Sequence, residues 1–357
     1  MVDISEYIKD LNSDNEKKRA FAAEDIAYDG LNEGIVFLVE RLQIETSRFV
    51  KEAIVNSLKT MNGSDLLDKV IPLLRSDDAF IRNAGIDILS VQGEKAIEPI
   101  RKLLSDPDKD VRKFALDVVM QLKNGYGAVL IAEALDDADI NIVITAVEYL
   151  GRLEAYAYAH RVNALLQNTP NLLLRCTCLE TLAVIANGES VATVSAVYPN
   201  SQLISPLELF SYLKFIASWG TEADLPLIID LMRDKGQIMH KEIINALQGI
   251  LHRHRQDRLE EELLSGLTAY LETGINEINK YELLVLLGAI KNEEVFPILV
   301  RYVASDNQLI RQGAVEGLGL YGRKEAQPVL AELKSQVTDE ELLEAIDLSL
   351  KQLNWMR

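Results

Sequence analysis

The stretch Ser76–Leu104, SDDAFIRNAGIDILSVQGEKAIEPIRKLL, decides how the chain folds. Asp77 and Asp78 place acceptors and negative charge where a helix N-terminus favours them. From Ile81, apolar or small residues recur at the i, i+3, i+4, i+7 and i+8 spacing of a helix with one buried face. Gly93 ends this helix, and a second apolar-periodic run follows with Pro99 near its start. The stretch therefore predicts a helical hairpin whose apolar face is too wide for two helices alone to bury.

The rest of the chain consists of approximate copies of this hairpin. Counterparts of Ile81, which we call the anchors, occur in eleven segments: Lys18, Val50, Ile81, Val111, Ile142, Leu174, roughly Leu209, Met239, Asn279, Ile310 and Leu342. Where the segments align best, successive anchors are 30 to 32 residues apart. A constant period predicts a solenoid, because only stacking on neighbouring repeats buries all of these faces. We expect one all-α solenoid of about eleven hairpins over residues 1–357.

Two segments depart from the period, around residues 187–219 and 240–280. The first contains the turn signal Tyr198-Pro199-Asn200. The second gains the run HRHRQDRLEEELLSGL from His252, for which we expect a longer helix or a protruding loop. Inserted material is where binding specificity is often added, and sequence drift is the alternative interpretation.

Composition restricts the class of ligand. The chain is 48% hydrophobic but only 6% aromatic, which favours a core of Leu, Ile, Val and Ala. Its net charge of −18 repels nucleic-acid phosphates and anionic lipids, so neither nucleic acid nor a membrane is expected as the main ligand. The first residues do not resemble a signal peptide, and we expect a cytoplasmic protein.

A repeated residue pattern, h-R-x-x-A followed by an acidic residue, stands as IRNAGIDILS from Ile81, VRKFALDVVM from Val111 and IRQGAVEGLGLYG from Ile310. This pattern resembles the HEAT repeat, in the shorter bacterial form first associated with phycobilisome lyases. The resemblance implies a right-handed α-α superhelix in which the helices that carry the anchors line the concave surface. We call these helices the anchor helices.

Some HEAT-like proteins are enzymes, but the sequence gives no basis for a catalytic, metal or cofactor site. The repeat-built diiron hydroxylase carries His-Glu dipeptides, whereas the four histidines here are each followed by Arg or Lys. The sequence also contains no Gly-rich phosphate loop and no G-x-S-x-G nucleophile turn. A chromophore-lyase-like enzyme stays open as an alternative, because those enzymes have no short motif that could be tested.

A basic residue follows the anchor in most repeats. This basic column comprises Arg19, Lys51, Arg82, Arg112, Arg175, Lys280 and Arg311, and Val143 interrupts it in the fifth repeat. We expect each cation to pair with a carboxylate of its own or a neighbouring turn, such as Asp77, Asp108 or Asp306. The column is therefore expected to be a structural ladder and not a ligand site.

An acidic residue stands six positions after the anchor. This acidic column comprises Glu24, Asp87, Asp117, Glu148, Glu180 and Glu316. At 100° per residue it lies opposite the buried face of the helix. Two interpretations stay open: an acidic stripe in a concave groove, or a solvated face with local i, i+4 ion pairs.

These patterns predict a non-catalytic scaffold or adaptor that binds a protein or peptide through an extended groove. The family resemblance implies a setting in bacterial regulation or assembly. A basic partner is favoured by the acidic column. The sequence does not determine the partner's identity or the oligomeric state.

Overall fold

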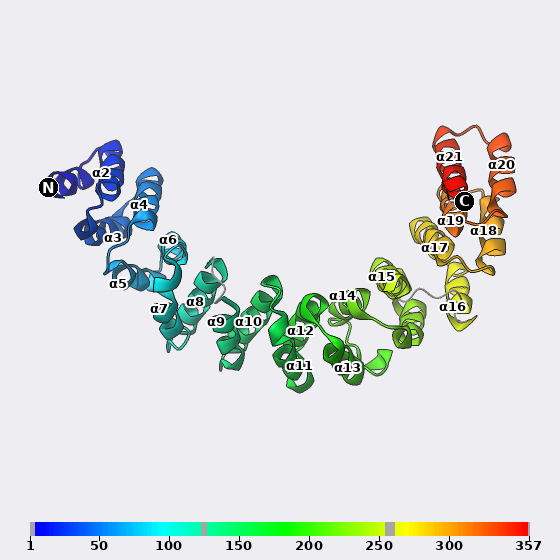
Figure 1. The fold of residues 1–357 in the computed structure, drawn as a ribbon, viewed down its shortest axis with the longest axis horizontal. Coiled ribbons are helices and arrows are strands. Elements are labelled where there is room, and N and C mark those ends of the chain that lie inside the picture. Colours follow the sequence, from blue (N-terminus) through cyan, green and yellow to red (C-terminus); the bar gives the residue numbers. More distant parts are fainter. Residues whose placement is uncertain (1–3, 123–126, 254–260, 356–357) are drawn as a thin grey trace. The chain divides into compact units, whose positions relative to one another are not determined.

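The computed structural model describes residues 4–122, 127–253 and 261–355, and all regular structure in these ranges is helical (Figure 1). The all-α repeat fold expected from the sequence is thereby confirmed. The contacts between residues divide the chain into two compact units, residues 1–158 and 159–357. The single solenoid over 1–357 stays a prediction.

The first unit is built from helix pairs in two layers. Its elements are α1 (Ile4–Leu11), α2 (Glu16–Tyr28), η1 (Asn32–Gly34), α3 (Ile35–Ile44), α4 (Arg48–Thr60), α5 (Leu66–Val70), η2 (Ile71–Arg75), α6 (Ala79–Ser90), η3 (Gly93–Ala96), α7 (Ile97–Leu103), α8 (Lys109–Gln121), α9 (Gly127–Glu133), η4 (Ala134–Asp136), α10 (Ile140–Arg152) and η5 (Tyr156–Tyr158). The anchor helices α2, α4, α6, α8 and α10 pack side by side in one layer, while α3, α5, α7 and α9 form the other (Figure 1).

The second unit repeats this arrangement. Its elements are α11 (Ala159–Asn168), α12 (Leu172–Ile185), α13 (Gly188–Val197), η6 (Ser201–Leu203), α14 (Leu209–Trp219), η7 (Glu222–Asp224), α15 (Leu225–Arg253), α16 (Glu261–Leu271), α17 (Glu277–Ile290), α18 (Val295–Val303), α19 (Gln308–Tyr321), α20 (Ala326–Gln336) and α21 (Glu340–Trp355). Each anchor helix again packs on the next: α12 on α14, α14 on α15, α15 on α17, α17 on α19 and α19 on α21.

The anchor helices begin with the same capping chemistry. The residue three positions before the anchor accepts a hydrogen bond from a backbone N–H of the first turn in α2, α6, α8, α10, α12, α17 and α19, through Asn15, Asp78, Asp108, Asp139, Asn171, Asn276 and Asn307. Each such cap stabilises a helix by about 1 kcal/mol relative to alanine. The short polar residues between repeats therefore fix where these seven anchor helices start.

The two irregular segments have distinct causes. In 187–219, the residues between α13 and α14 include the short helix η6. The buried residues Tyr212, Leu213, Phe215 and Ile216 of α14 follow Glu208 at the same spacing as the buried residues of α6 follow Ile81. The anchor of this repeat is therefore Glu208 and not Leu209. In 240–280, α15 runs for 29 residues across a kink at Met239, where φ is −118° and ψ is 28°. The longer helix or protruding loop expected from His252 stays a prediction, because residues 254–260 of that run lie outside the described residues.

Helices α17 and α19 approach so closely that glycine is required between them. A Cβ atom at Gly288 of α17 would lie 2.0 Å from the Gly317 backbone oxygen of α19. At Gly317 itself, a Cβ would lie 2.7 Å from the Leu284 oxygen. Any side chain there must push the two backbones apart.

Gly288→Ala should therefore lower the free energy of unfolding by about 1–3 kcal/mol, the usual cost of overpacking. Gly188→Ala is the matched control, because a Cβ at Gly188 meets no atom within 4 Å. It should change stability by less than about 0.5 kcal/mol. Chemical denaturation measures both, and equal stabilities for the two variants would contradict the close approach.

Candidate functional site

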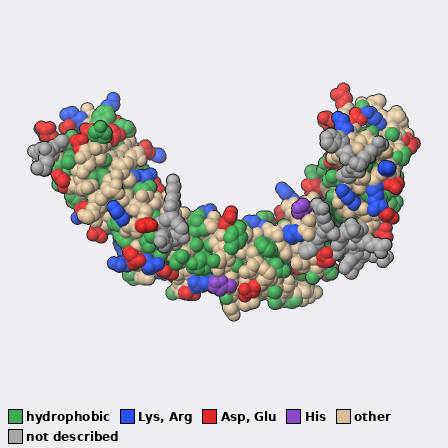
Figure 2. All heavy atoms as spheres, viewed as in Figure 1, with side chains coloured by type: hydrophobic (Ala, Val, Ile, Leu, Met, Phe, Trp, Pro, Cys, Tyr) green, Lys and Arg blue, Asp and Glu red, His purple; other side chains and the backbone are tan. Residues whose placement is uncertain are grey.

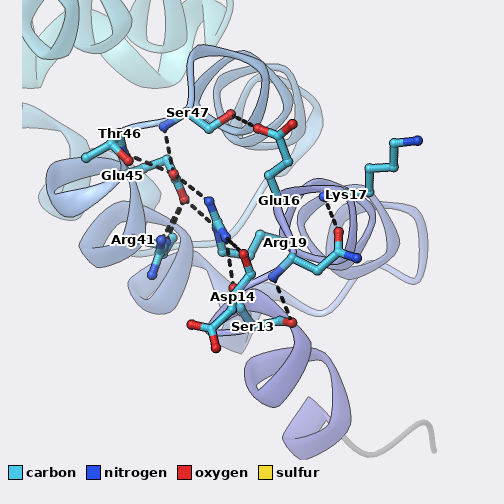
Figure 3. A network of polar contacts seen from close by, with 10 residues as sticks. Ser13, Asp14, Glu16, Lys17, Arg19, Arg41, Glu45, Thr46 and Ser47 are labelled. Atoms are coloured by element: carbon cyan, nitrogen blue, oxygen red, sulfur yellow. Dashed lines mark hydrogen bonds and ion pairs between the residues drawn. The ribbon is translucent and has the colours of Figure 1, made fainter.

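The clearest polar structure of the first unit surrounds Arg19 and Glu45 (Figure 3). Arg19 Nε and Nη2 donate to the two carboxylate oxygens of Glu45 at 2.8 and 2.9 Å, and Nη1 donates to the Ser13 carbonyl at 2.8 Å. Glu45 lies in the turn between α3 and α4 and also accepts from Arg41 Nε at 2.8 Å and from the Ser47 N–H at 2.8 Å. The Glu45 side chain is fully buried. This network joins the first anchor helix to the start of the second.

Burial by itself would raise the pKa of Glu45, but the hydrogen bonds from Arg19, from the Ser47 backbone and from Arg41 outweigh it and lower the pKa to about 2. A carboxylate whose pKa is lower in the folded than in the unfolded state stabilises the protein above its unfolded pKa. This contribution disappears as the pH falls through the folded pKa.

We therefore expect Glu45 to contribute about 3 kcal/mol to the free energy of unfolding at neutral pH, lost between about pH 5 and pH 2. The measurement compares denaturant unfolding of the wild type and of Glu45→Gln across this range. The difference in stability should shrink steadily toward pH 2, because glutamine cannot titrate. A difference that stays constant with pH would show that Glu45 does not carry the lowered pKa.

The same geometry recurs along the basic column. Arg82, Arg112 and Arg311, like Arg19, donate to the carbonyl of the residue six positions earlier in the turn before the anchor helix. Arg112 Nε and Nη2 also donate to both oxygens of Asp137 at 2.7 and 2.8 Å, and Lys51 Nζ lies 3.2 Å from Asp78. The column therefore connects the turns of adjacent repeats.

The carboxylate partners are not the three named from sequence. Asp78, Asp137, Glu45 and Glu208 pair with the column, whereas Asp77, Asp108 and Asp306 were expected. Val143 is buried at the position where the column is interrupted, and Lys280 lies half-buried in α17.

Arg175 of the basic column pairs with residues of the first irregular segment. Arg175 Nε donates to Glu208 at 2.5 Å, and the Tyr198 hydroxyl donates to the same carboxylate oxygen at 2.6 Å. The Arg175 guanidinium also lies 5.0 Å from the centre of the Tyr198 ring, which gives a cation–π contact. Glu208 is only 2% exposed. The longer segment between α13 and α14 thus places Tyr198 beside a buried ion pair.

The acidic column lies entirely on anchor helices, but its members differ. Glu24 and Asp87 are exposed, and Glu148 is exposed and pairs with Arg152 at 3.3 Å. Asp117 is half-buried, accepting from the Tyr149 hydroxyl of α10 at 2.5 Å and pairing with Lys113 at 3.1 Å. Local i, i+4 ion pairs are therefore present in the column, and the acidic stripe in a concave groove stays a prediction.

The two members in the second unit also contact a neighbouring repeat. Glu180 accepts from the Ser211 hydroxyl at 2.9 Å and pairs with Lys214 at 3.2 Å, both on the next anchor helix. Glu316 accepts from the Tyr281 hydroxyl at 2.5 Å, which with burial raises the pKa of Tyr281 to about 12. Glu24, Asp87 and Glu148 are the column members most accessible to a partner.

Charge is mixed on the face that Figure 2 draws. Figure 2 shows acidic and basic side chains interspersed on the face in view, in both units. Among the described residues, no group of three or more His, Cys, Asp or Glu side chains is arranged to hold a metal ion. His240 is buried and stacks on the Tyr270 ring, with its Nδ1 3.1 Å from the Tyr270 hydroxyl. Within the described ranges, no helix combines the length and apolar composition needed to cross a bilayer.

Sequence reasoning missed a set of exposed apolar residues at or just before the start of the anchor helices of the second unit. Leu173, Leu207, Ile238 and Ile278 are 67%, 69%, 81% and 61% exposed. All four immediately precede an anchor, once the seventh anchor is placed at Glu208. Reading the residue before each anchor as a column of its own would have found them.

Comparison with known proteins agrees with this architecture. The family model for HEAT repeats matches residues 264–351. A search of curated proteins by sequence gave no match. Among solved structures, Kap95p bound to RanGDP is 14% identical, covering 98% of this chain and 56% of that chain with a TM-score of 0.61. Importin β crystallised from polyethylene glycol is 14% identical, covering 99% and 59% with a TM-score of 0.60.

The stacked helix pairs define an α-solenoid. The family model matched over residues 264–351 and the solved structures of the same fold support a HEAT-repeat protein, as the pattern around Ile81 and Ile310 indicated. The chain spans somewhat more than half the length of Kap95p and importin β, and the likeness to them concerns the fold.

Proposed function

We propose that the protein is a non-catalytic scaffold or adaptor that binds a protein or peptide partner through the layer formed by its anchor helices. The observation that carries the proposal is the exposure of Glu24, Asp87 and Glu148 at one register on α2, α6 and α10. Carboxylates repeated along a stack attract a basic partner and orient it, with an effect that weakens as salt rises.

The fold supports this role because a stack of repeats offers a long surface on which many weak contacts add up. The solved structures of Kap95p include one with RanGDP and one with Nup1, so a solenoid of this kind can serve as a binding surface for other proteins. A cytoplasmic location and a place in bacterial regulation or assembly are part of the same proposal.

The alternative is a chromophore-lyase-like enzyme or enzyme subunit. It requires a bound tetrapyrrole, so the purified protein would absorb visible light. The solved structures of similar fold do not favour this alternative, because Kap95p and importin β are named as nuclear import proteins and not as lyases.

The test is affinity capture from the native cytosol with the wild type and with Glu24→Lys, Asp87→Lys and Glu148→Lys combined. Asp117 is left intact, because its hydrogen bond from Tyr149 connects α8 to α10. The combined variant should fold normally and retain at most about a tenth of the captured partner, with the wild-type interaction weakening in high salt.

The matched control reverses three exposed carboxylates of the same unit that lie outside the anchor helices, Glu40, Asp68 and Glu94. Its net charge equals that of the first variant, so any difference reports position and not total charge. Equal capture by both variants would refute the role of the anchor-helix layer.

A further inference from the structure

Four consecutive repeats of the second unit carry an exposed aliphatic residue at one register, on α12, α15 and α17 and in the turn before α14. We call Leu173, Leu207, Ile238 and Ile278 the aliphatic row. Each lies nine residues before a fully buried Leu or Ile, namely Leu182, Ile216, Leu247 and Leu287. The helices concerned are packed neighbours in the order α12, α14, α15 and α17. The row is therefore continuous along the stack.

Scattered exposed apolar residues are normal on any protein surface, but a run at one register of successive repeats is not scattered. The same register in the first unit is not uniformly aliphatic: Lys17, Asp110 and Asn141 are polar, Phe49 is exposed and Phe80 is partly covered. There Phe80 is only half-exposed, and the Lys51 ammonium lies 5.1 Å from its ring centre. The corresponding residues of the row are instead left uncovered.

The spacing of the row indicates the shape of what could cover it. Packed helices lie about 8–10 Å apart, so successive row residues recur at about this distance. Two turns of an α-helix advance ~10.5 Å in seven residues and return to the same face. An extended strand returns to one face every ~6.7 Å, which does not match. A helix with an aliphatic residue at every seventh position therefore meets all four row residues.

The exposed area of the row and the charge around it distinguish a helix of another protein from a second copy of this chain. The accessible surface of the four row side chains is roughly 500 Å², which is typical of a functional surface patch. This area is smaller than the ~800 Å² that each partner buries in a stable dimer. One turn further along each anchor helix, the charged residues are Glu242, Glu282 and Lys241. Carboxylates outnumber cations there, and the chain carries a net charge of −18. A positively charged helix fits better than a second copy of this acidic chain.

We infer that the aliphatic row binds an amphipathic α-helix of another protein, with Leu or Ile every seven residues and Lys or Arg on its polar side. This inference rests on the proposed scaffold function and names the chemistry of its partner.

The test uses the full chain and a labelled 22-residue peptide with leucine at positions 1, 8, 15 and 22 and Lys and Ala elsewhere, followed by fluorescence anisotropy. The wild type should bind it, and the peptide should become helical on binding. The combined Leu207→Asn and Ile238→Asn variant should bind at least about tenfold more weakly, because it loses two central apolar contacts. The exposure of both side chains predicts an unchanged melting temperature.

The matched control is Leu203→Asn with Leu348→Asn, two exposed leucines of the same unit outside the row, at 55% and 57% exposure. It should bind like the wild type. The inference is overturned if the wild type does not bind the peptide, or if both double variants bind equally. It is also overturned if a peptide with leucine at every third residue in a polyproline helix binds more tightly, or if sedimentation shows a dimer that the row variant abolishes.

Failure here is separable from failure of the proposed function. If capture from the cytosol still depends on Glu24, Asp87 and Glu148 while the helical peptide does not bind, the scaffold function stands and only the helix partner is excluded.

Discussion

The structure depends on burial of the apolar side of each anchor helix against the anchor helix of the next repeat. No repeat can complete this burial alone, because the buried residues of one helix require a neighbour of the same kind. Ile81, Ala84, Ile88 and Leu89 of α6 are all buried in this way, between repeats before and after. The helix caps and the basic column hold the anchor helices in position for this burial. The caps fix where most anchor helices start, and Arg19, Lys51, Arg112 and Arg175 connect one turn to the next.

This constraint also explains where function can lie. The buried positions and the ladder of Arg19, Arg112 and Arg175 are committed to stacking, since their donors are satisfied by turn carbonyls and buried carboxylates. The residues that remain for a partner are those facing away from the stack. They form two sets on or beside anchor helices, an acidic set in the first unit and an aliphatic set in the second. A scaffold that uses both combines charge, which speeds association, with apolar contacts, which slow dissociation.

Much of the fold was predictable because hydrophobic spacing is set by local geometry. The period from Ile81 predicted the helix pairs, and the capping position at Asp78 was visible as an acidic pair before the helix. The seventh anchor was misplaced by one residue, because a pattern of apolar residues cannot identify a glutamate as a buried position. Glu208 is buried only because Arg175 and Tyr198, distant in sequence, satisfy its carboxylate. The kink at Met239 was likewise hidden, since it does not interrupt the apolar pattern around it.

The acidic column was located correctly on anchor helices, but its division into free and paired members depends on contacts between repeats, such as Asp117 with Tyr149.

The central claim is that partners approach the anchor-helix layer, and site-specific photocrosslinking tests it most directly. A photoreactive residue placed at Asp87 on α6 should capture a protein from the cytosol, and the same residue at Asp68 on α5 should not. Capture at Asp68 with none at Asp87 would contradict the account.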